Sequence, residues 1–198
     1  MLYLHIENQK TKVTMEREVN FYQRLFAGNI KLDGDVIIGD PCYFGRNNDE
    51  INNVITKVKP GWYEAFFYEV DYGKSGGSRE MALEIFFKDM PEKEKDYLCF
   101  DEEIGRVPVD AGMVCAFDFG YIENNMRGEN GEYSEDWYQK MCNITLRSFH
   151  GEEGYDCDIY EDRGVVTPSG WGDGCYPVFV AKDGDDVVGI RVVFTGDF

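Results

Sequence analysis

Three aspartates, Asp40, Asp110 and Asp173, lie beside proline or glycine at the edges of segments with the pattern of β-strands. A fold that gathers these strand ends would bring three carboxylates together, and such oxygen ligands suit a hard cation such as calcium or magnesium. The same residues are common turn formers, because an aspartate side chain bonds readily to nearby backbone. The sequence leaves both interpretations open, and it contains no calcium-loop register.

The turn from Ser169 to Pro177 holds three glycines within five residues, around Trp171 and Asp173. Glycine permits backbone conformations closed to other residues, so this turn could expose successive amides as an anion-binding nest. The alternative is a tight turn with no ligand. If the turn lines a pocket, the residues that would bind a small ligand or a metal are Asp40, Cys42, Asp110, Ser169, Trp171 and Asp173.

Cysteine chemistry is the other candidate for catalysis. A nucleophilic Cys42 would need a base or a positive neighbour to populate its thiolate, and His5 and His150 lie in no nucleophile signature. The motifs GxxxxGK[ST], GxGxxG and HExxH are absent. Six cysteines without CxxC spacing indicate reduced thiols in a cytoplasmic protein. We therefore expect no catalytic residue, no metal and no cofactor, with an enzyme built on the pocket described above as the alternative.

Net charge is the largest anomaly of the composition. Over 198 residues, 38 acidic and 20 basic side chains leave a charge of −18, well beyond the magnitude of about 2 to 8 that keeps a small domain soluble. Residues 1–31 carry +2, so the rest of the chain carries −20. A field of this sign repels phosphates, which disfavours direct contact with nucleic acid and favours basic protein surfaces as partners.

The acidity is densest between residues 121 and 162, where the net charge is −8 and aromatic residues alternate with carboxylates. A solvated acidic face is the simpler explanation. The aromatic residues favour a binding surface that imitates a nucleic-acid backbone, as in phage-encoded inhibitors of bacterial defence nucleases such as anti-CRISPR proteins. The residues expected to contact the partner are Glu129, Glu132, Glu135, Asp136, Trp137, Glu152, Glu153, Tyr155, Asp156, Asp158, Glu161 and Asp162.

The elements that position these residues are expected to form one α+β domain, 1–198, mainly of antiparallel β-structure in a sandwich or barrel, with one or two peripheral helices. A helical arm is predicted in residues 1–31, since apolar side chains recur at helical spacing over 14–27 and Gly28 could cap the helix. A second helix is predicted to start at Ser134, with Trp137, Met141 and Ile144 on one face. Strands are predicted at 35–39, 62–72, 81–87, 107–109, 113–121, 165–166, 175–182 and 187–194.

Three short motifs resemble those of a family of bacterial and phage proteins known as a domain of unknown function. They are Ile38–Tyr43, Val107–Gly112 and Ser169–Pro177, followed by the closing strands, and together they span the framework from about Val36 to Phe194. The resemblance implies no activity and no catalytic residues. The first 31 residues and the acidic segment 121–162 are less similar to the family core, which makes them candidates for a function particular to this chain.

Overall fold

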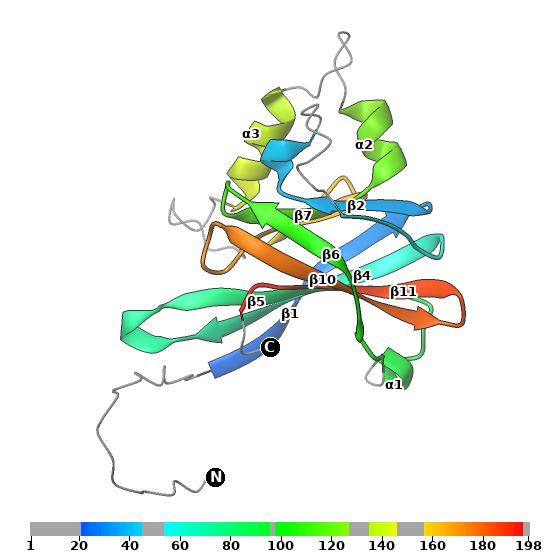
Figure 1. Cartoon of the computed structure of the whole chain (residues 1–198), viewed down its shortest axis with the longest axis horizontal. Helices are drawn as coiled ribbons and strands as arrows, with labels where there is room; N and C mark the ends of the chain where they lie inside the picture. Colours follow the sequence, from blue (N-terminus) through cyan, green and yellow to red (C-terminus); the bar gives the residue numbers. More distant parts are fainter. Residues whose placement is uncertain (1–20, 45–53, 96–97, 127–134, 146–156, 196–198) are drawn as a thin grey trace, which may run out of the picture.

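The computed structural model describes residues 21–44, 54–95, 98–126, 135–145 and 157–195, and it consists mainly of two antiparallel β-sheets (Figure 1). The six-stranded sheet has the order β1-β4-β5-β11-β10-β6, and the five-stranded sheet has the order β3-β2-β7-β9-β8. The strands are β1 (Phe21–Leu32), β2 (Asp35–Gly39), β3 (Val54–Lys57), β4 (Gly61–Asp71), β5 (Ser78–Phe87), β6 (Glu102–Val109), β7 (Met113–Asp118), β8 (Asp158–Tyr160), β9 (Gly164–Pro168), β10 (Gly174–Asp183) and β11 (Asp186–Val193).

The two sheets enclose the main hydrophobic core. Buried side chains from both sheets meet there, among them Ile30, Tyr63 and Ile85 from the large sheet and Ile38 and Val114 from the small one. The α-helices α2 (Phe119–Asn125) and α3 (Glu135–Thr145) cover the other face of the small sheet (Figure 1). The molecule is therefore layered as sheet, sheet and helices, which confirms the predicted sandwich-like α+β class.

The predicted helix over residues 14–27 is wrong where the structure describes it, because residues from Phe21 onward form β1; residues 1–20 lie outside the described residues. A β-bulge between Phe26 and Gly28 explains the error. Leu25 and Ala27 face the core before it and Ile30 faces the core after it, so the bulge shifts the alternation and hides the strand pattern. Gly28 is no helix cap: its φ is +152°, and a Cβ there would lie 2.5 Å from Ile159 Cγ1.

The other helix expectations are closer to the structure. Trp137, Met141 and Ile144 are all buried on one face of α3, as predicted. The strand predicted over 113–121 ends earlier, because Asp118 caps α2 by accepting a hydrogen bond from the Tyr121 backbone N–H at 2.8 Å. A third short helix, α1 (Glu92–Lys95), follows β5. Within the described part of the chain, no helix is long and apolar enough to cross a membrane.

The strands predicted at 62–72 and 81–87, and those predicted at 175–182 and 187–194, pair as two antiparallel hairpins. Strands β4 and β5 pair through a turn that includes the short 3₁₀ helix η2 (Gly73–Ser75), and β10 and β11 pair through the turn at Gly184. Strand β2 has the bounds expected from the sequence and delivers Asp40 to a second 3₁₀ helix, η1 (Pro41–Tyr43). The sheets thus hold the ends of β2, β6 and β9 in fixed positions, and the three motifs lie at those ends.

Candidate functional site

The three sequence motifs meet at one end of the sandwich. We call this group the motif cluster and define it as Asp40–Tyr43, Asp110–Gly112 and Ser169–Tyr176. The Ser169 backbone N–H donates to the Gly112 carbonyl at 3.0 Å, and Gly112 approaches Gly172 closely. The Asp40 carboxylate accepts hydrogen bonds from the backbone of the second motif. Segments far apart in the chain are therefore joined through backbone contacts.

Asp40 is the centre of the motif cluster and is fully buried. Its Oδ1 accepts from the Cys42 N–H at 2.8 Å, and its Oδ2 accepts from the Asp110 and Ala111 N–H groups at 2.8 and 2.7 Å. Three backbone donors therefore compensate the buried negative charge. This carboxylate holds the first two motifs together, and each of its oxygens already accepts at least one backbone hydrogen bond.

The glycine-rich turn is also held from within. The buried Ser169 hydroxyl and the Tyr176 hydroxyl both donate to the Gly172 carbonyl at 2.7 Å. Gly170 has a φ of +67°, and a Cβ there would lie 2.4 Å from the Glu80 carbonyl oxygen, so only glycine fits. These bonds support the turn interpretation of the sequence motif.

Three other candidate residues of the motif cluster, Asp110, Trp171 and Asp173, are exposed. Asp110 and Asp173 are exposed, and Trp171 is 41% exposed while its ring contacts Tyr72 at a centroid distance of 5.3 Å. Partial burial, followed by the neighbouring Asp110 carboxylate, raises the pKa of the Tyr43 phenol. Cys42 is half-buried, and burial raises the pKa of the nearby Cys115 thiol well above its usual value. Within the described ranges, no group of three or more His, Cys, Asp or Glu residues could hold a metal ion.

Residues 32–193 match the family model described as protein of unknown function (DUF4241). The chain belongs to this family. No curated protein and no solved structure matches it. The match confirms the resemblance to a domain of unknown function, without testing the individual motifs. It begins after the first 31 residues and runs through the acidic segment 121–162.

Half of the predicted partner-binding residues of this DUF4241 protein lie outside the described residues: Glu129, Glu132, Glu152, Glu153, Tyr155 and Asp156. Glu135 begins α3, and Asp136 is exposed on that helix. Asp158 is half-buried at the start of β8, whereas Glu161 and Asp162 are exposed in the turn between β8 and β9. Trp137 corrects the prediction: it is only 3% exposed and packs against Phe44 and Phe117, so it is a core residue and no surface anchor.

The turn between β8 and β9 is tied to the body of the DUF4241 fold by Arg163. Its guanidinium pairs with Asp33 at 2.8 Å and with the buried Asp118 at 2.9 Å. Asp118 also accepts from the Asp33 backbone N–H at 2.6 Å. The hydrogen bond from Arg163, followed by that from Lys31, lowers the pKa of the Asp33 carboxyl. One cation thus links the β1–β2 turn, the start of α2 and the β8–β9 turn.

Replacing Arg163 with methionine is expected to lower the free energy of unfolding by about 1 to 3 kcal/mol at pH 7, because the buried Asp118 loses its cationic partner. Asp33 adds a pH dependence. Its folded pKa lies below the unfolded value, so its stabilisation is present above about pH 4 and disappears as the pH falls through the folded pKa. In urea denaturation from pH 7 to pH 3, the difference between wild type and Arg163→Met should narrow toward the acidic end as the share of Asp33 is lost.

The matched control is Lys182→Met, which removes an exposed ion pair with Glu102 at 2.6 Å. A surface pair of this kind contributes about 0.5 kcal/mol or less, so this variant should denature almost like wild type. If Arg163→Met is no less stable than Lys182→Met at pH 7, Arg163 does not tie these elements together.

A pocket beside the same turn is missed by the sequence analysis. It has a volume of about 400 Å³ and is lined by Asn29, Trp62, Lys88, Asp89 and Asp162. Its residues come from β1, β4, the segment after β5 and the β8–β9 turn. The sequence pattern places Asn29 after a helix and Trp62 at the start of a strand, so nothing in it associates them with Asp162. The 43% exposure of Trp62 is visible only in the structure.

Proposed function

We propose that this protein acts by binding, and that it presents an acidic surface to a basic, nucleic-acid-binding surface of another protein. The supporting observation is the different use of the carboxylates inside and outside the fold. Buried carboxylates are compensated internally: Asp40 by backbone N–H groups, Glu84 by Arg191 and Asp118 by Arg163. The exposed carboxylates of the acidic segment are available to an external partner.

Asp136 is exposed on α3, and Glu161 and Asp162 are exposed in the β8–β9 turn. Helix α3 reaches β8 where the Trp137 and Tyr160 rings stack with their centroids 6.5 Å apart. Within the described part of the chain none of the three forms an ion pair, although Glu161 accepts a hydrogen bond from the Tyr121 hydroxyl. The exposed Lys140 ammonium interacts electrostatically with Asp136 and Glu161 and offsets part of their charge. The remaining negative charge raises the local concentration of oppositely charged partners and speeds association. We call these three residues the acidic surface.

The test compares two pairs of substitutions that remove the same charge from different places. Asp136→Asn with Glu161→Gln removes two charges from the acidic surface, while the amide oxygen of the introduced glutamine can still accept from Tyr121. Asp183→Asn with Asp185→Asn removes two charges from the exposed β10–β11 turn. The probe is a fluorescent peptide of alternating arginine and lysine, and binding is followed by stopped-flow anisotropy at several salt concentrations.

We expect the acidic-surface pair to slow association about fivefold at low salt, with the difference shrinking as salt screens the charges. The β10–β11 pair should change the rate much less. Equal effects of the two pairs would mean that only the net charge attracts the peptide, and the proposed acidic surface would be abandoned. Affinity that does not depend on salt would contradict the proposal as well.

A further inference from the structure

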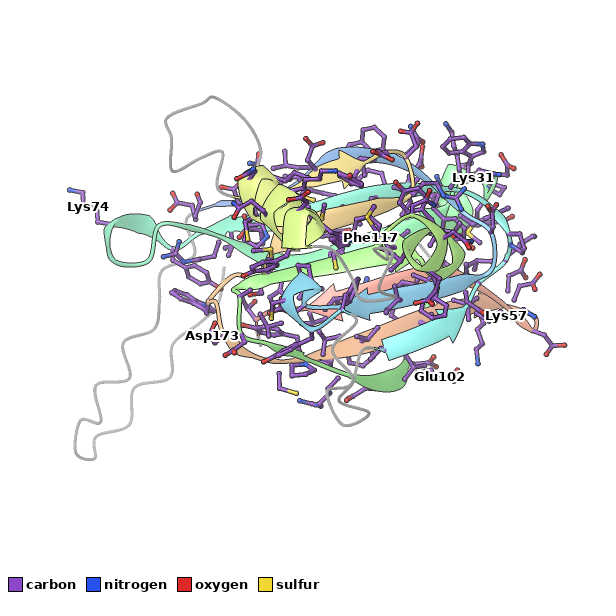
Figure 2. All side chains as sticks on the ribbon, turned by 90° about the horizontal axis from the view of Figure 1, so that it is seen from above. Lys31, Lys57, Lys74, Glu102, Phe117 and Asp173 are labelled. Carbon is purple, nitrogen blue, oxygen red and sulfur yellow. The ribbon has the colours of Figure 1, made fainter. Side chains whose placement is uncertain are left out.

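A pocket next to the acidic surface shares Asp162 with it. This pocket is lined by Asn29, Trp62, Lys88, Asp89 and Asp162. It is remote from the motif cluster, because Lys31, the register partner of Trp62, lies at the opposite end of the molecule from Asp173 (Figure 2). Its walls are fixed by backbone hydrogen bonds: the Lys31 N–H donates to the Asp162 carbonyl at 2.7 Å, and the Lys88 N–H donates to the Trp62 carbonyl at 2.8 Å. The backbone around the pocket is therefore held in place.

The pocket offers hydrogen-bond acceptors with no partner inside the described part of the protein. The Oδ1 atom of Asn29 is buried and accepts no hydrogen bond there. This atom is closed to solvent while the pocket is empty, so a ligand could bond to it only if the Asn29 side chain turned toward the pocket. The Asp89 and Asp162 carboxylates are exposed and form no ion pair within the described residues. The neighbouring cations Lys31 and Arg163 are already paired, with Asp33 and with Asp33 and Asp118 respectively.

We propose that this pocket binds a guanidinium group, which deepens the proposed function and rests on it, since arginine is abundant on basic protein surfaces. A guanidinium is flat, carries five N–H donors and has no acceptor that would need a partner. Its faces stack on an indole, the aromatic ring that attracts cations most strongly. Its edges match carboxylate oxygens, which here are supplied by Asp89 and Asp162.

Other ligand classes fit the lining less well. Anions meet two carboxylates against one ammonium, and an apolar group would cover the Asp89 and Asp162 carboxylates without pairing them. Lysine supplies a point charge that cannot serve several separated acceptors at once. Lys88 is the one cation of the lining, and its side chain is exposed. Its positive charge repels a guanidinium and weakens its binding, but it can pair with a carboxylate carried by the same ligand.

Because Lys88 can pair with a carboxylate, its substitution distinguishes the binding of free arginine from the binding of an arginine side chain in a protein. Free arginine carries a carboxylate, whereas an arginine within a protein chain does not. Lys88→Met should therefore weaken the binding of free L-arginine and strengthen the binding of the capped peptide acetyl-Gly-Arg-Gly-amide, each by about two- to fivefold. We commit to the protein-borne arginine, so the capped peptide should bind wild type at least as tightly as free arginine.

The direct readout is the NMR signal of the indole N–H groups, because the chain has three tryptophans. Titration with acetyl-Gly-Arg-Gly-amide should shift the Trp62 signal and leave those of the buried Trp137 and the remote Trp171 in place. Trp62→Leu identifies the signal by its loss. The same peptide with citrulline, which keeps the shape and removes the charge, should bind about tenfold more weakly, and the lysine peptide should also bind more weakly.

Trp62→Leu and Asp162→Asn should each weaken the arginine peptide about fivefold or more. The matched control is Trp171→Leu, since Trp171 is 41% and Trp62 43% exposed; it should bind like wild type. Equal binding of arginine and citrulline peptides, or an unmoved Trp62 signal, would overturn the guanidinium site. If that occurs while Asp136→Asn with Glu161→Gln still slows the basic peptide, the proposed function stands without this pocket. If the pocket binds the arginine peptide but Asp136→Asn with Glu161→Gln does not slow the basic peptide, the guanidinium site stands and the proposed acidic surface is abandoned.

Discussion

Asp40→Ala is expected to lower the free energy of unfolding by about 3 to 6 kcal/mol, since three backbone N–H groups lose their acceptor at a buried position. A domain of this size is stable by only about 5 to 15 kcal/mol. The variant is therefore expected to be close to unfolding at 37 °C. Urea denaturation followed by circular dichroism at 25 °C provides the measurement.

Two neighbouring aspartates serve as controls for this prediction. Asp110→Ala and Asp173→Ala remove exposed carboxylates of the same motif cluster, so both variants should stay within about 0.5 kcal/mol of wild type. Asp40→Asn keeps one acceptor oxygen and should fold even where the alanine variant does not. Its Ala111 amide should exchange hydrogen faster than in wild type. Equal stability of Asp40→Ala and Asp173→Ala would show that Asp40 does not hold the motifs together.

Arg191→Met is expected to lower the free energy of unfolding by about 3 to 5 kcal/mol, because it leaves a buried carboxylate without its cationic partner. Glu84 lies on β5 with 1% of its side chain exposed, where it accepts hydrogen bonds from the Tyr68 hydroxyl and from Arg191. The guanidinium also lies 4.1 Å from the centroid of the Phe100 ring. Removing the cation leaves the carboxylate with the tyrosine alone, and the measurement is again urea denaturation at pH 7.

The double variant Glu84→Gln with Arg191→Met tests the cause. It removes both charges while the glutamine oxygen can still accept from Tyr68, so most of the lost stability should return. If the double variant is as unstable as Arg191→Met, packing of the arginine rather than the stranded charge accounts for the loss. Arg106→Met, which removes an exposed ion pair with Glu103 at 2.9 Å, should have almost no effect.

Local pattern is sufficient for much of the fold. Strand β2, the hairpins β4–β5 and β10–β11, and the buried face of α3 follow from alternation, turn residues and helical spacing, which act over a few neighbouring residues. The prediction for strand β1 is wrong because its bulge breaks the alternation, and its state is decided by its antiparallel pairing with β4, far along the chain. The apolar residues there have the spacing of a helix, but that spacing carries no information about the neighbouring strand.

For the candidate sites, too, some properties follow from the sequence alone and others depend on the tertiary structure. Residue types alone established the strong negative charge, the acidic segment and the three family motifs. Only the tertiary structure decided that Asp40 and Ser169 are bonded inside the protein, that Trp137 lies in the core, and that Asn29 and Trp62 share a pocket with Asp162. Composition depends on the chain itself, whereas burial and convergence depend on which distant segments pack together, and that is set by the global balance of contacts rather than by any local pattern.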